Sequence, residues 1–174
     1  MKTETYPAHT SVSAPTQSQD ARSLAALLCA TDRSAAPLVL RLALAAVVFP
    51  HGAQKLLGWF GGYGFNGTMQ FFTTAMHIPA PLALGAILIE FFAPLLLALG
   101  LATRAAALSV GTVLGTAMFM AHTRHGFFMN WSGTQQGEGI EYFLLVLGIA
   151  AALILSGGGR LSADRAIHRR IAGA

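Results

Sequence analysis

Charged residues are scarce in this sequence. Lysine, arginine, aspartate and glutamate make up 10% of its 174 residues, whereas an average soluble domain has about 25%. Hydrophobic residues make up 54%, and this imbalance excludes an ordinary water-soluble domain. The one cysteine, Cys29, excludes an intrachain disulfide and a CxxC redox pair. The sequence also lacks a flavin or nicotinamide fingerprint, so any redox cofactor would have to be a quinone, a haem or a group held by a partner.

The sequence does contain four long apolar windows. Each approaches the ~20 residues that a helix needs to cross ~30 Å of hydrocarbon, and none alternates as a β-barrel strand would. The predicted spans are 37–58, 81–102, 105–121 and 139–157. The link between the second and third spans is so short that these two should form a tight antiparallel hairpin. The sequence therefore predicts an all-α integral membrane protein with a four-helix transmembrane bundle.

The basic residues indicate the orientation of this bundle. They lie before the first span, in the tight link and after the last span: Lys2, Arg22, Arg33, Arg104, Arg160, Arg165, Arg169 and Arg170. By the positive-inside rule, both termini are cytoplasmic and the loops 59–80 and 122–138 face outward. The net charge of +4 does not indicate nucleic-acid binding, because no stripe of aromatic and basic residues accompanies it.

The windows and the charges together divide the chain into three parts. We expect a disordered polar cytoplasmic tail at 1–35, because this segment is rich in serine, threonine, proline and glutamine. The membrane domain should cover 36–160, and a basic cytoplasmic tail should follow at 161–174. The membrane domain makes the lipid bilayer the first partner of the protein.

The first outer loop is long and rich in glycine and aromatic residues. Met69, Phe72 and Met76 recur in it at helical spacing, which predicts a short interfacial helix lying on the membrane surface. Trp59 precedes this helix at headgroup depth and is a candidate binding residue. A lid held down by interfacial aromatic residues is the alternative interpretation of the loop.

Ionisable residues inside the first two spans are the strongest functional signal, because a charge in hydrocarbon costs from ~2.5 to over 10 kcal/mol. The first span contains Arg41, His51 and Lys55, and the second contains Glu90 near its midpoint. At a rise of ~1.5 Å per residue, His51 is nearest to Glu90 in depth, while Lys55 and Arg41 can approach from opposite sides. We expect His51, Lys55 and Glu90 to face the bundle interior as a proton-handling cluster, with either Lys55 or Arg41 paired to Glu90.

Other residues near the cluster support a polar interior. Pro50 and Pro94 lie inside the first two spans, where each should kink its helix and free a backbone carbonyl. His122 closes the third span and Glu141 opens the fourth, both on the outer side, and both are candidate binding residues. No group of residues has the spacing of a metal site, so no metal is predicted.

Four motifs follow the order and spacing of a known family. They are HGAQKLLGWFGG at 51–62, HGFFMNW at 125–131, EYFLLVLG at 141–148 and GGGRLSADR at 157–165. With Arg41 and Glu90 inside the first two spans, the chain resembles the DoxX family over residues 36–166. The resemblance implies a small four-helix, multi-pass protein of the bacterial inner membrane, of a kind commonly labelled an oxidoreductase. A related branch, DoxD, supplies a subunit of a thiosulfate–quinone oxidoreductase, and other relatives are linked to membrane assemblies for oxidative-stress defence.

Three functions fit these observations. In the first, the protein handles a quinone or quinone-like small molecule, which His51, Lys55 and Glu90 bind and supply with protons. In the second, it is a non-catalytic membrane subunit that anchors a redox protein partner. In the third, it transports a small solute, although four spans are few for a transporter and no inverted repeat is visible. A b-haem held by His51 and His122 is a minor alternative.

Overall fold

The computed structural model describes Thr31 and residues 34–172, and in this part of the chain all regular structure is helical. The principal helices are α2 (Ala36–Leu57), α3 (Gly64–Gln70), α4 (Ala80–Leu99), α5 (Thr103–Ala117), α6 (Glu141–Ser156) and α7 (Ala163–Ala172). A π-helical turn, Phe71–Ala75, extends α3, and a second, Met118–His122, extends α5 into the short 3-10 turn Thr123–His125. The prediction of an all-α protein is confirmed for these residues.

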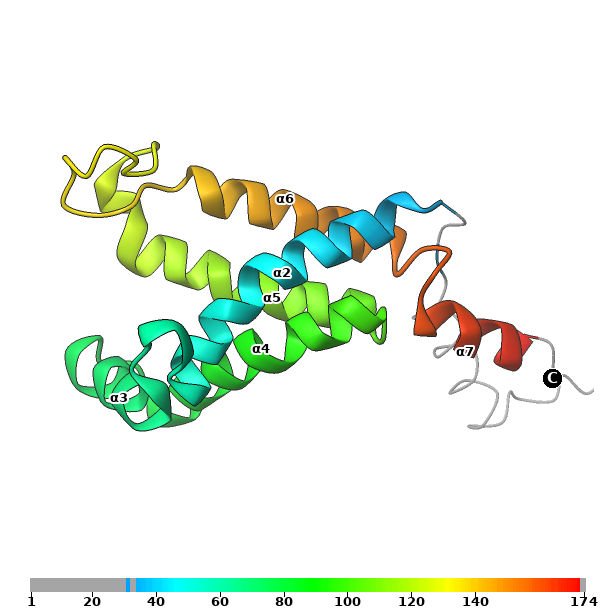
Figure 1. The fold of residues 1–174 in the computed structure, drawn as a ribbon, viewed down its shortest axis with the longest axis horizontal. Helices are drawn as coiled ribbons and strands as arrows, with labels where there is room; N and C mark the ends of the chain where they lie inside the picture. The colour runs from blue at the N-terminus through cyan, green and yellow to red at the C-terminus, as the bar shows by residue number, and fades with distance from the viewer. Residues whose placement is uncertain (1–30, 32–33, 173–174) are drawn as a thin grey trace, which may run out of the picture.

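Four of the helices form a bundle. Figure 1 shows α2, α4, α5 and α6 running along the long axis of the molecule, with α3 beyond one end and α7 beyond the other. The packing order is a ring, in which α2 contacts α4, α4 contacts α5, α5 contacts α6 and α6 contacts α2. Aliphatic side chains from all four helices fill the core between them: Leu44, Val48, Leu97, Val110, Val146 and Leu153.

Local sequence explains where the first two long helices begin and end. Pro37 and Pro81 lie in the first turns of α2 and α4, where proline costs no hydrogen bond. Gly58 and Gly100 follow their last turns in the left-handed conformation, which glycine adopts most easily. Only Gly100, Leu101 and Ala102 separate α4 from α5, so the predicted tight hairpin is confirmed.

Three helices are long and apolar enough to cross a membrane: Ala36–Leu57, Ala80–Leu99 and Thr103–His125. The fourth, α6, is apolar but has 16 residues, which gives a length of about 24 Å. The third helix also continues past the predicted end at 121, because the π-helical turn carries it to His125. The number of spans and the orientation of the bundle stay predictions.

The C-terminal segment closes the end of the bundle at which α2 begins. The Asp164 carboxylate accepts hydrogen bonds from the backbone N–H groups of Ala102 (2.7 Å) and Thr103 (2.9 Å). These groups open α5 and have no partner within that helix. Asp164 therefore ties α7 to the α4–α5 hairpin, and the GGGRLSADR motif is the segment that leads from α6 to this contact.

The two remaining parts of the chain differ in how far the structure describes them. The helix predicted in the first outer loop is present as α3 and its π-helical extension, whereas its position on the membrane surface stays a prediction. Most of the predicted tail 1–35, including Cys29, lies outside the described residues. Thr31 and Ser34 are described, and both contact the segment after α6: the Ser34 carbonyl accepts a hydrogen bond from the Arg160 N–H (3.0 Å).

Candidate functional site

A buried ion pair joins the first two long helices. The Lys55 ammonium on α2 donates a hydrogen bond to the Glu90 carboxylate on α4. The Glu90 side chain is 4% exposed and the Lys55 side chain is 28% exposed. The carboxylate is therefore enclosed by the bundle, while the lysine stem reaches it from the side on which α2 ends. The sequence left two candidate cations for Glu90, Lys55 and Arg41. In the structure Lys55 forms the ion pair.

The backbone of α2 and α4 is unusually close at this pair. A Cβ atom on Gly52 would lie 2.2 Å from the Glu90 carbonyl oxygen, so only glycine fits there. Pro94 lies inside α4 and has no N–H, so the Glu90 carbonyl lacks its usual partner one turn later. Gly52 packs on this carbonyl, and Lys55, one turn further along α2, shares its face. The close crossing thus positions the ammonium over the carboxylate.

His51 is not part of this buried pair. The structure exposes His51 on the outer surface of α2, so the expectation that it faces the bundle interior is wrong. At 3.6 residues per turn, His51 is rotated by about 60° from the fully buried Val48, whereas Lys55 is rotated by only about 20°. Counting residues along the helices placed His51 at nearly the same membrane depth as Glu90. Its angular position around α2 nevertheless points its side chain away from α4.

Arg41 also has a different role from the one predicted. It lies 14 residues before Lys55, which is about 21 Å along a helix, and its guanidinium is fully buried. It donates to the carbonyls of Leu97 (3.0 Å), Ala98 (3.4 Å) and Leu161 (2.6 Å).

These carbonyls explain why a buried arginine is stable there. Leu97 and Ala98 belong to the last turn of α4, whose carbonyls carry the negative end of the helix dipole. The Leu97 carbonyl also accepts a hydrogen bond from the N–H of Gly100 (3.0 Å). The Asp164 carboxylate lies within electrostatic range of the guanidinium. Gly100, at φ +65°, leaves the space that Arg41 occupies, since a Cβ there would lie 2.1 Å from Nη1. Arg41 is a structural residue that holds the end of α4, and it does not contact Glu90.

The outer candidates lie apart from the pair. The His122 Nδ1–H donates a hydrogen bond to the Glu138 carbonyl (3.0 Å), and the ring packs on Phe143 with centroids 4.4 Å apart. Glu141 accepts a hydrogen bond from the Trp131 indole (3.4 Å). Trp59 is exposed just after α2. The contacts of His122 and Glu141 hold the segment between α5 and α6, and none of these contacts involves His51.

Tyr142 belongs to the interior at this end, and the sequence reasoning missed it. Its hydroxyl oxygen is buried without a hydrogen-bond partner among the described residues, and it lies within electrostatic range of the Glu90 carboxylate. A sequence signal for the buried face of α6 is the helical spacing of its core residues. These residues are Phe143, Val146, Ala150 and Leu153.

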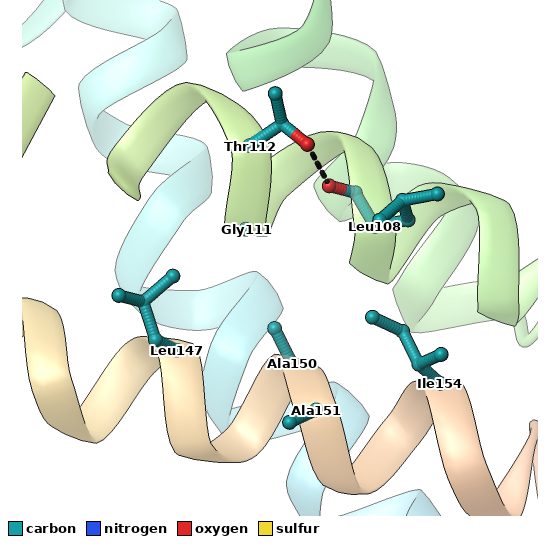
Figure 2. Close-up of a pocket in the computed structure, with 7 residues that line it drawn as sticks. All are labelled: Leu108, Gly111, Thr112, Leu147, Ala150, Ala151 and Ile154. Carbon is teal, nitrogen blue, oxygen red and sulfur yellow. Dashed lines mark hydrogen bonds between the residues drawn. The ribbon is translucent and has the colours of Figure 1, made fainter. Parts of the chain in front are cut away.

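A shallow hollow of about 240 Å³ lies elsewhere, between α5 and α6. Figure 2 shows its lining, which is apolar apart from Thr112, whose hydroxyl donates back to the Leu108 carbonyl (2.9 Å). Small residues, Gly111 and Ala150, let the two helices approach closely here. The Thr112 hydroxyl, the polar side chain of this lining, is already hydrogen-bonded within α5. No group of three His, Cys, Asp or Glu residues that could hold a metal ion occurs in the residues described.

Comparison with known proteins gives one match. The family model of DoxX matches residues 36–123, slightly more than half of the chain. The matched segment contains Arg41, the Lys55–Glu90 pair and the whole of α2 to α5. Neither a curated protein nor a solved structure matches the chain.

Proposed function

Because the chain belongs to the DoxX family, we propose that it is a bacterial inner-membrane protein that binds a quinone-like small molecule in redox metabolism. In this proposal α2, α4, α5 and α6 all cross the bilayer, and both termini are cytoplasmic. The family and the three membrane-length helices support a multi-pass membrane protein. The redox role extends the activity that the DoxX resemblance implies, including a part in oxidative-stress defence.

The Lys55–Glu90 pair is the observation that carries this proposal. Burying a carboxylate and an ammonium within a membrane helix pair is costly, and bundles of this size are held together without such pairs. Ionisable groups kept inside a membrane bundle are therefore candidates for a ligand or proton site. Here the two groups are adjacent, on neighbouring helices, at the end of the bundle lined by aromatic residues such as Phe49 and Phe91.

The chemistry of a quinone suits this pair. Reduction to the quinol takes up two electrons and two protons, and each proton ends on a ring oxygen. We propose that the Lys55 ammonium donates the protons one at a time, while Glu90 compensates the charge of the site. The partly exposed Lys55 side chain regains protons from the outer side. The electrons come from a redox protein partner in the membrane.

The test separates activity from folding. Membranes containing the wild type, Glu90→Gln, Lys55→Met or the double variant are compared for quinone reduction per amount of folded protein. The double variant removes both charges together and should recover folded yield, yet reduce quinone at less than about a tenth of the wild-type rate. Arg169→Gln, which removes an exposed charge on α7, is the control and should keep full activity.

An anchoring subunit is the second candidate function. The observation that favours it is that Lys55 and Glu90 satisfy each other without any ligand, as a purely architectural pair would. Exposed aromatic residues, Trp59, Phe60 and Phe65, give this candidate a surface for a redox protein. Full activity of the charge-free double variant would contradict the quinone-site proposal and support the anchor.

A further inference from the structure

The Tyr142 hydroxyl is a fixed donor without an acceptor. Its oxygen is buried and makes no hydrogen bond to any described residue. The ring cannot turn freely, because it packs edge-on against Phe143 with centroids 5.2 Å apart and contacts the core cluster. A buried hydroxyl without a partner is unfavourable and is rare in folded proteins. The position therefore suits an acceptor that the chain itself does not provide.

The place of Tyr142 in the fold relates it to the ion pair. The helix α6 begins at the end of the bundle at which α2 finishes (Figure 1), so Tyr142 in the first turn of α6 lies at the same end as Lys55 in the last turn of α2. In the packing ring, α6 contacts α2 and α5, so α4 lies diagonally across the bundle from it. The Tyr142 phenol is nevertheless within electrostatic range of the Glu90 carboxylate. Tyr142 on α6, Lys55 on α2 and Glu90 on α4 are thus carried by three helices of the ring, with α2 between the other two.

We propose that the Tyr142 hydroxyl donates a hydrogen bond to a carbonyl oxygen of the quinone-type head group bound beside Lys55 and Glu90. This inference rests on the proposed function. A quinone carbonyl only accepts hydrogen bonds, and a phenol hydroxyl can donate one. After reduction, the quinol hydroxyl can donate instead, and the same phenol oxygen then accepts. One tyrosine can thus serve both states of the ligand, which phenylalanine cannot.

The substitution Tyr142→Phe tests this, because it removes only the hydroxyl. The full chain is purified in mild detergent, and binding of decylubiquinone is measured by equilibrium dialysis alongside thermal unfolding. We expect the dissociation constant to rise about five- to tenfold, the effect of one lost hydrogen bond. The melting temperature should stay the same or rise, because the hydroxyl has no partner to lose. Tyr63→Phe is the matched control: Tyr63 is 84% exposed, and neither value should change.

The other possible results of the Tyr142→Phe measurements also support or overturn the proposed hydrogen bond. An unchanged dissociation constant, whether the melting temperature stays or falls, overturns the role of Tyr142 while leaving the quinone site standing. If both binding and melting temperature fall, a decylubiquinone analogue with two methoxy groups in place of its carbonyls is dialysed against both proteins. An affinity loss confined to the carbonyl compound supports the inference, and an equal loss for both compounds overturns it. Absence of binding to the wild type overturns the proposed function itself.

Discussion

Removing the charge of Lys55 should destabilise the bundle more than removing the charge of Glu90. The reason is the difference in enclosure, since the Glu90 side chain is 4% exposed and the Lys55 side chain 28%. In Lys55→Met, the carboxylate keeps its buried position and has no cation. In Glu90→Gln, the long lysine stem can carry its ammonium outward to the interface. The two halves of one ion pair therefore have unequal costs.

The magnitudes follow from known buried pairs. Removing one partner of such a pair costs roughly 3–5 kcal/mol, and we expect Lys55→Met in this range. Glu90→Gln should cost about 1–3 kcal/mol, because lysine can relax toward water. The double variant should lose less than the sum of the two, with a coupling of about 1–3 kcal/mol. Arg41→Met with Glu90→Gln should instead be additive within about 0.5 kcal/mol, since distant sites do not couple.

The assay is reversible unfolding of the purified full chain in mixed micelles, with SDS as denaturant and circular dichroism as the signal. The three single variants (Lys55→Met, Glu90→Gln and Arg41→Met) and the two double variants are measured at one pH and one detergent concentration. A larger loss for Glu90→Gln than for Lys55→Met would refute the argument from enclosure. Recovery of Glu90→Gln by Arg41→Met would refute the assignment of Lys55 as the partner.

Two further predictions concern packing and topology. Gly52→Ala should lower the unfolding free energy by about 1–3 kcal/mol, because its methyl group would meet the Glu90 carbonyl at 2.2 Å. Gly85→Ala, a glycine of α4 with no atom within 4 Å of an added Cβ, should be neutral or stabilising by up to about 1 kcal/mol in the same titration; equal effects would contradict the close crossing. Reporter domains fused after Asn66 or Asn130 should be active only outside the cytoplasm, and a cytoplasmic signal from either would rule out the proposed orientation.

The sequence predicted the helices well because their signal is local. Long apolar windows with proline at the start and glycine at the end define α2 and α4 to within a few residues. The end of the third helix was harder to predict. The π-helical turn at Met118–His122 and the 3-10 turn at Thr123–His125 continue the helix to His125, whereas the polarity of residues 122–125 had suggested a loop.

The candidate site was predicted in part. The depth of a residue in the membrane can be counted along its helix, whereas the orientation of its side chain around the helix is harder to predict. Counting residues brought Lys55 and Glu90 together, and the structure pairs them. The same counting placed His51 in the cluster, but the angular position of His51 around α2 exposes its side chain instead. Arg41 could not be assigned, because its partners are backbone carbonyls that leave no mark in the sequence. Tyr142 was missed because an unsatisfied hydroxyl is visible only when the surrounding atoms are placed.

The buried guanidinium of Arg41 has a consequence for biosynthesis. Its acceptors lie 56 and 120 residues later in the chain, at Leu97 and Leu161. During translation the first span therefore enters the membrane with a cation that has no tertiary partner until the second span follows. The last acceptor, Leu161, is made only after all four bundle helices have been synthesised. A chain that stops before Leu161 leaves Arg41 without one of its three carbonyl acceptors.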